Sequence, residues 1–408
     1  MRNQIPLLAV GALALLTACG SAAPSGDMNA SGTLFNVSRA TPVTVSASAA
    51  QTSATRATCV PVPGRAGNTF SPIDASFTSP SDGWLLGVVM NDCATGGIIE
   101  ARATVDGGLH WAKATAPPAP WGGVAPNGSG NVPLDGVTRV LFANAKDGWA
   151  YGPGLWVTHN GGVSWHEVST HRHVVYSMAV TSGYVVATFG TCGSFGSYCY
   201  APATFTVEAT PVHRDAWLSA PGAAGEGTPA LTAAGGTAYA YGASAPSFPG
   251  KLTLLAGPAN GSKHWHSQAM PCPAGAITAS AASAIHLLLA CALLGTHPTT
   301  THLYRSTDGG ARWTQFATRP LFDGASVIEQ TPNGTLLTGG IYNGIELSRD
   351  GGRTWAQPAN VDDSNSIQGG GYLAAALATN NDGYVIGYLG PLWITRNGGK
   401  SWRQISVH

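Results

Sequence analysis

The sequence predicts an all-β chain folded as a seven-bladed β-propeller, and evenly spaced tryptophans are the first observation behind this fold class. The successive gaps between seven of them are 54, 52, 48, 48, 42 and 47 residues. A period of about 40–50 residues is the length of one four-stranded propeller blade. Seven repeats of this length can close into a ring. The tryptophans are Trp111, Trp165, Trp217, Trp265, Trp313, Trp355 and Trp402.

Five of these tryptophans end a shared phrase with the pattern Ser/Thr-x-Asp/Asn-Gly-Gly-x-x-Trp. An Asx-Gly pair between apolar runs is a strong signal for a β-hairpin, because the tight turn needs positive φ. Asp and Asn interchange in the pattern, which indicates a side-chain oxygen bonded to the turn backbone and not a metal ligand or catalytic acid. We therefore interpret the phrase as structural. Its Asx and Trp residues are Asp106 and Trp111, Asn160 and Trp165, Asp308 and Trp313, Asp350 and Trp355, and Asn397 and Trp402.

A second phrase, a short turn followed by an apolar run, recurs ahead of the tryptophans. Each copy predicts a turn that leads into a buried strand. Because this marker also occurs seven times, the two patterns predict the same number of blades. The clear copies are Ser81–Gly87, Lys146–Gly152 and Asn381–Gly387, and the weaker ones are Thr181–Val186, Gly236–Gly242, Ile285–Leu289 and Asn333–Leu337.

The five hairpin phrases resemble the Asp-box, or BNR, repeat of sialidases and their relatives. The stretch Leu141–Trp165 resembles the photosystem II stability/assembly factor family, whose members are seven-bladed propellers. The resemblance covers about residues 68–408, although the third and fourth repeats lack the phrase and keep only Trp217 and Asn260–Trp265. It implies a protein that assembles a membrane complex, and the cyanobacterial members of that family are lipoproteins. The motif is specific for the fold and a weak guide to function.

The N-terminus has the pattern of an exported lipoprotein. Arg2 precedes a mostly apolar stretch from Ile5 to Ala18 that is typical of a signal peptide, since a membrane-spanning helix needs roughly 20 residues. Leu16–Gly20 resembles the bacterial lipobox and predicts cleavage before Cys19 and lipidation of its thiol. The alternative is a simple secretory signal with an incidental cysteine. Acyl chains would anchor the protein to the outer face of the bacterial cell membrane, or to the outer membrane of a Gram-negative cell.

Composition divides the chain into three parts. Residues 1–18 form the expected signal peptide. Residues 19–57 begin with the lipidated cysteine and are rich in Ser, Ala and Thr. Such a segment cannot bury enough apolar surface to fold, so we expect a flexible, disordered tether. Residues 58–408 form the predicted propeller.

The charge balance excludes some classes of partner. The chain has 20 basic and 20 acidic residues, and only 10% of its residues are charged. A nucleic-acid partner would require a basic footprint, so we expect none. The sequence contains no phosphate-binding loop, nucleophile elbow or HExxH motif and predicts no cofactor. We expect a monomer that contacts the membrane only through its lipid anchor.

Six cysteines follow Cys19, and an even number in an exported protein suggests disulfides. Pairing of neighbours is our prediction among the 15 connectivities that six cysteines allow. Because no C-x-x-C spacing occurs, a metal site is the less favoured interpretation. The predicted pairs are Cys59–Cys93, Cys192–Cys199 and Cys272–Cys291.

The loops on one face of the ring are the predicted binding surface. In a propeller, the loops that join the second strand to the third and one blade to the next gather on the face opposite the hairpins. Several of these loops are long, and long loops are disproportionately functional. Exposed aromatic residues there would suit a protein or a sugar ring; the alternative is that they cap the end of the propeller. The candidates are Trp121 in residues 113–137, Phe195 and Tyr198 in 190–205, Phe248 in 243–251, and Asp362 and Asp363 in 356–371.

The favoured function is a non-catalytic scaffold or assembly factor of the cell envelope that binds a protein through this loop face, and no catalytic residue is assigned. The alternative is a carbohydrate-binding or glycoside-hydrolase surface protein. A sialidase would need clustered arginines to hold a carboxylate, and Arg65, Arg139 and Arg319 could converge beside Asp74. The Arg-Ile-Pro signature of sialidases is absent. Two carboxylates about 5–10 Å apart would favour the enzyme.

Overall fold

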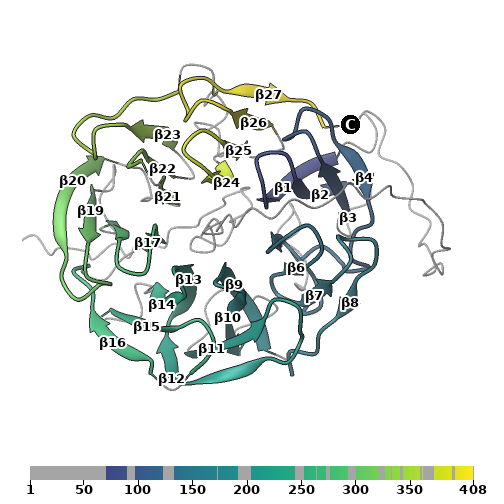
Figure 1. Ribbon diagram of the computed structural model, residues 1–408, viewed down its shortest axis with the longest axis horizontal. Helices are drawn as coiled ribbons and strands as arrows, with labels where there is room; N and C mark the ends of the chain where they lie inside the picture. The colour runs from purple at the N-terminus through teal and green to yellow at the C-terminus, as the bar shows by residue number, and fades with distance from the viewer. Residues whose placement is uncertain are drawn as a thin grey trace, which may run out of the picture.

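The computed structural model describes seven antiparallel sheets arranged as blades around one axis (Figure 1), which confirms the predicted fold class. Its described residues contain strands and turns but no helix, and therefore no helix long and apolar enough to cross a membrane. The described residues are 70–89, 97–122, 133–171, 173–191, 204–243, 252–262, 264–272, 276–292, 300–320, 327–331, 333–340, 343–358, 361, 372–387 and 391–407.

The blades follow one another along the chain, and each begins with its innermost strand. Blade 1 contains β1 (Phe70–Phe77), β2 (Gly83–Val89), β3 (Ile98–Thr104) and β4 (Ala112–Ala114), and blade 2 contains β5 (Arg139–Phe142), β6 (Gly148–Tyr151), β7 (Leu155–Thr158) and β8 (His166–Glu167). Blade 3 contains β9 (His173–Thr181), β10 (Tyr184–Thr191), β11 (Thr204–Pro211) and β12 (Leu218–Glu226), blade 4 contains β13 (Thr228–Ala234), β14 (Thr237–Ala243), β15 (Thr253–Pro258) and β16 (His266–Ala269), and blade 5 contains β17 (Ala276–Ala281), β18 (Leu287–Ala292), β19 (Thr300–Ser306) and β20 (Thr314–Pro320). Blade 6 contains β21 (Val327–Gln330), β22 (Leu336–Gly340) and β23 (Asn343–Ser348), and blade 7 contains β24 (Tyr372–Leu377), β25 (Gly383–Gly387), β26 (Leu392–Thr395) and β27 (Arg403–Ile405).

The recurring tryptophans fill the seams between blades. Each one stands directly before the outermost strand or strand-like residue of its blade, and each packs into the hydrophobic core shared with the preceding blade. Trp111, for example, meets the ring of Phe77 edge-on at 6.0 Å, and Trp165 meets Phe142 in the same way at 6.0 Å. A large apolar side chain at a fixed position in every repeat therefore forms one core per seam.

The hairpins show why the phrase needs its hydroxyl and Asx residues. In blade 1, Thr104 Oγ1 accepts a 2.8 Å hydrogen bond from the Gly108 amide and donates one of 2.8 Å to Asp106 Oδ1. The amide of His110 donates to the same carboxylate at 3.0 Å, and this bond is the leading cause that holds the pKa of Asp106 well below its usual range. Gly107 and Gly108 have φ angles of 74° and 84°, a backbone conformation that residues with a side chain rarely adopt.

The hairpins and the turns between the first and second strands lie on the same face of the ring, which we call the hairpin face. The amide of Gly107 donates to the carbonyl of Ser81 at 2.7 Å, and Gly161 and Gly398 make the equivalent bonds in blades 2 and 7. The connections between the second and third strands leave from the opposite end of each blade. This opposite end is the loop face.

Blade 6 is the exception to the four-stranded plan. Its fourth position holds a single bridge, in which Leu347 and Ala356 exchange two hydrogen bonds of 2.9 Å. Pro358 follows two residues later and has no N–H to donate to β23, so it cannot extend the pairing.

Within the part of the chain that the structure describes, the first and last blades pack against each other and share no strand. All four strands of blade 7 come from the C-terminal end of the chain, and all four of blade 1 come from residues 70–114. A common core joins the two blades, with Phe77 and Tyr384 rings 5.8 Å apart. Arg396 of blade 7 donates a hydrogen bond to the carbonyl of Gly107 in blade 1.

Candidate functional site

Polar side chains of the innermost strands join neighbouring blades around the axis. Asp74 Oδ2 and Ser76 Oγ on β1 accept hydrogen bonds of 2.8 Å from the amides of Val140 and Phe142 on β5. In the same way, Ser177 Oγ accepts from Leu231 at 3.2 Å, and Thr232 Oγ1 accepts from Ala281 at 3.0 Å. These inner strands belong to different sheets, so side chains satisfy amides that lack a sheet partner there.

Asp74 is the first of two buried carboxyl groups in this region. Asp74 is 7% exposed. Burial raises the pKa of Asp74 to about 6, while the Arg139 guanidinium and the Val140 amide act in the opposite direction. At pH 7 the group is therefore mostly ionised and is held by a backbone donor from the next blade.

Glu329 on β21 is the second buried carboxyl group, and it was not predicted from the sequence. It is 7% exposed, and burial raises its pKa to about 8 against the opposing effect of a 3.2 Å hydrogen bond from Ser280 Oγ on β17. At pH 7 the carboxyl group is mostly protonated. The sequence signal that could have identified Glu329 is its position directly after two β-branched residues, Val327 and Ile328, in an apolar strand.

Tyr384 on β25 links these groups electrostatically. Burial raises its pKa well above the ordinary value, and the charges of Asp74 and Glu329 add to this effect. The Tyr384 hydroxyl donates a 2.8 Å hydrogen bond to the Ala75 carbonyl. We call Asp74, Arg139, Glu329 and Tyr384 the axial cluster; its members come from blades 1, 2, 6 and 7.

Arg139 and Arg319 do not come together as the arginine clamp that a sialidase would need. Arg139 lies on the inner strand β5, whereas Arg319 lies on the outer strand β20. Arg319 is bonded there to both carboxylate oxygens of Glu346, at 3.0 and 2.5 Å, because a guanidinium pairs with a carboxylate in this two-pronged manner. Arg65 lies outside the described residues.

Trp121 is the one predicted aromatic candidate that the structure describes. It makes an isolated bridge with Val137 and packs, half-buried, against the core between blades 1 and 2 that contains Trp84 and Phe142. Its ring therefore contributes to a seam in addition to any surface it presents. The other candidates lie outside the described residues: Phe195, Tyr198, Phe248, Asp362 and Asp363, together with Cys19, Cys59, Cys93, Cys192 and Cys199.

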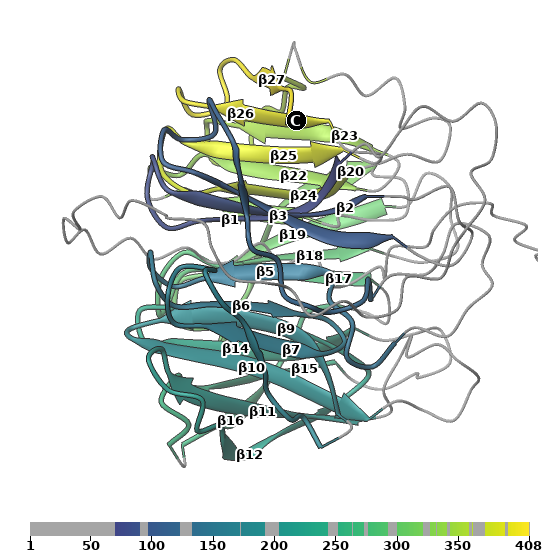
Figure 2. The same cartoon turned by 90° about the vertical axis from the view of Figure 1, so that its right-hand side faces the viewer.

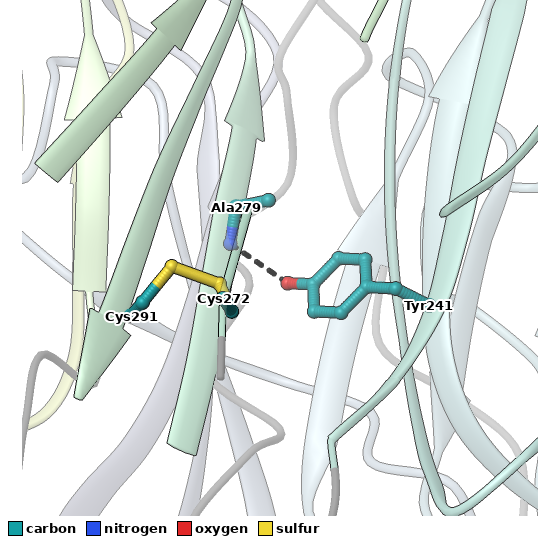
Figure 3. Close-up of a disulfide and its surroundings, with 4 residues drawn as sticks. All are labelled: Tyr241, Cys272, Ala279 and Cys291. Carbon is teal, nitrogen blue, oxygen red and sulfur yellow. Dashed lines mark hydrogen bonds between the residues drawn. A yellow bond between two sulfur atoms is a disulfide. The ribbon is translucent and has the colours of Figure 1, made fainter. Parts of the chain in front are cut away.

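A disulfide joins Cys272 to Cys291, with a Cα–Cα distance of 5.4 Å (Figure 3). This bond is one of the three predicted pairs. It ties the segment that enters blade 5 to strand β18. Close by, the amide of Ala279 donates a 2.8 Å hydrogen bond to the hydroxyl of Tyr241, so blades 4 and 5 are joined at the same place. Among the described residues, no three His, Cys, Asp or Glu side chains gather to hold a metal ion.

This chain shares its fold with solved structures of other propellers. No family model and no curated protein matches the sequence. The structure resembles YCF48 bound to a D1 peptide, with a TM-score of 0.53 and 17% identity over 83% of this chain and 95% of that one. It also resembles YCF48 from Cyanidioschyzon merolae, with a TM-score of 0.51 and 14% identity over 83% of this chain and 97% of that one. A GH74 enzyme from Niastella koreensis matches at a TM-score of 0.37 and 14% identity, over 83% and 54% of the two chains.

Proposed function

We propose that this protein is a non-catalytic scaffold that binds an envelope protein or membrane complex through the loop face of its propeller. The observation that carries the proposal is the fold shared with a propeller that was solved with a peptide bound, across 95% of that protein. The hydrogen bonds of the axial carboxyl groups support it, because Asp74 and Glu329 are both occupied by contacts to a neighbouring blade.

We further propose that the propeller works at a membrane surface, to which the lipidated Cys19 and the tether through residue 57 attach it. Cys19→Ala tests this part separately. The variant should leave the membrane fraction and appear in the soluble fraction, whereas an unchanged distribution would contradict lipid anchoring.

Affinity purification from crosslinked membranes tests the scaffold function. The bait is the tagged full chain, compared with a variant in which residues 123–132 are replaced by a short Gly-Ser linker. This change keeps the bridge between Trp121 and Val137 that borders the segment. The matched control is Val105→Ser with Val163→Ser, two exposed apolar residues of the hairpin face. We expect a stoichiometric protein partner that the control retains and the loop variant loses.

Equal recovery of the partner with all three baits would show that the partner does not bind through residues 123–132. A preparation without any partner would contradict the scaffold proposal and favour the second candidate.

The second candidate is a glycan-cleaving protein, and one observation favours it. A glycoside hydrolase uses one protonated and one ionised carboxyl group, and the pKa values of about 8 for Glu329 and about 6 for Asp74 give that combination near pH 7. A polysaccharide hydrolysis screen with the wild type, Glu329→Gln and Asp74→Asn decides this. Activity that both variants lose would establish the enzyme; the scaffold proposal expects no hydrolysis by any of the three.

A further inference from the structure

Charged side chains on the hairpin face connect three successive pairs of blades. Arg349, the second residue of its hairpin phrase, donates a 3.2 Å hydrogen bond to the carbonyl of Gly398 in blade 7. Arg396, at the same position of the next phrase, donates to the carbonyl of Gly107 in blade 1. Arg305 makes the corresponding 2.6 Å contact from blade 5 to blade 6. An arginine keeps its charge at every physiological pH, so these contacts do not titrate.

Blade 2 has a histidine at that position. Blade 3 lacks the hairpin phrase, and His159 contacts a carboxylate there instead of a glycine carbonyl. Its Nε2 lies 3.1 Å from Asp215 Oδ1, in the connection between β11 and β12. Its Nδ1 lies 2.6 Å from Asp147 Oδ1, in the turn before β6 of its own blade. His166 Nε2 lies 2.9 Å from the second oxygen of Asp215.

This geometry requires a charged imidazole. Only the protonated ring donates from both nitrogens, and a neutral ring would direct a lone pair at one of the two carboxylates. Partial burial opposes the charge on His159, but hydrogen bonds and attraction from Asp147 and Asp215 outweigh burial and raise its pKa above the ordinary value. Lys146 and Arg214, the nearest cations in sequence to the two aspartates, are exposed.

We propose that His159 is a proton-operated latch between blades 2 and 3, closed when the ring is charged and released when it loses its proton. Release leaves Asp215 with its contact to His166 alone and loosens the connection that leads into Trp217. Trp217 packs edge-on against Phe189 at 5.6 Å in the core of this seam. The hairpin-face contact between blades 2 and 3 is then sensitive to pH, whereas the three hairpin-face contacts made by arginine are not.

The first test follows the His159 ring by NMR from pH 5 to 9 in the intact protein. The latch predicts a titration midpoint above the usual value of about 6.5. A midpoint at or below that value would overturn the proposal, and this measurement needs no variant.

Hydrogen exchange of residues 210–218, corrected for the intrinsic effect of pH, provides the second test. We expect protection to fall by about tenfold for each unit by which the ring pKa is raised, as pH passes through the midpoint. His159→Arg should keep the contact and remove the pH dependence, and Asp215→Asn should remove protection at low pH. The hairpin Thr395–Trp402, contacted by Arg349, is the internal control. Identical pH profiles for the wild type and His159→Arg would refute the latch.

Discussion

The hydroxyl of Tyr384 donates a 2.8 Å hydrogen bond to the carbonyl of Ala75, 309 residues earlier in the chain. This bond crosses the only seam of the ring whose two blades are not consecutive in sequence. Figure 2 shows the yellow strands of blade 7, including β24 and β25, above β1 of blade 1. Since the described strands of blades 1 and 7 are not exchanged between the two sheets, side-chain contacts of this kind hold these blades together.

Tyr384→Phe should therefore weaken ring closure. The change leaves a buried carbonyl without its donor, which costs about 1–3 kcal/mol, and we expect a corresponding fall in the free energy of unfolding in urea. Hydrogen exchange should increase in β1 and β24 together. Tyr239→Phe is the matched control, because that hydroxyl makes the same kind of bond, 2.5 Å to Ala284, across the seam between consecutive blades 4 and 5.

If Tyr239→Phe loosens β1 as much as Tyr384→Phe does, the closing seam has no special role. Exchange that increases only beside the substituted seam is the result that the structure predicts.

The buried carboxyl of Glu329 makes stability fall as pH rises. Its folded pKa of about 8 lies above the unfolded value of 4.5, so between these values the native state holds a proton that the unfolded state has lost, and raising the pH favours unfolding. Glu329→Gln keeps a neutral hydrogen-bonding group. We expect it to match the wild type near pH 5 and to be more stable by an amount on the order of a few kcal/mol near pH 9.

The measurement is the urea midpoint of both proteins from pH 5 to 9. Glu346→Gln is the control, since it removes the partly exposed ion pair with Arg319 and should lower stability at every pH in this range. Parallel curves for the wild type and Glu329→Gln would show that Glu329 does not carry the pH dependence.

The Cys272–Cys291 disulfide should stabilise blade 5. It spans a sequence separation of 19 residues, and closing a loop of this length removes chain entropy worth about 3 kcal/mol. Cys272→Ser with Cys291→Ser should lower the unfolding free energy, measured without a reducing agent, by up to this amount relative to the wild type. Non-reducing peptide mapping that finds both thiols free would contradict the bond.

The architecture was predictable from sequence because its determinants are local. Trp111 and its six counterparts fill equivalent seams, and the Asx-Gly turns need only residues within one phrase. The axial cluster was predictable only in part: Asp74 and Arg139 were candidates for a converging site, but Glu329 was not. The latch was not predictable, because His159 and Asp215 are 56 residues apart and no local pattern indicates which side chains meet across a seam.

Thr158 provides a test of the hairpin phrase itself. Its buried Oγ1 accepts a hydrogen bond of 2.9 Å from the Gly162 amide and donates one of 2.9 Å to Asn160. Thr158→Val has nearly the same shape but leaves that amide without an acceptor, at a cost of about 1–3 kcal/mol. Thr158→Ser keeps the hydroxyl, as in Ser306 of blade 5, whose Oγ accepts from the Gly310 amide at 2.9 Å.

Urea unfolding and hydrogen exchange of Thr158–Trp165 measure both variants. We expect Thr158→Ser to remain within about 1 kcal/mol of the wild type and Thr158→Val to lose stability and protection in that hairpin. Equal stability of the two variants would mean that the hydroxyl does not organise the turn. The recurring Ser or Thr would then need an explanation outside the fold, such as contact with a partner on the hairpin face.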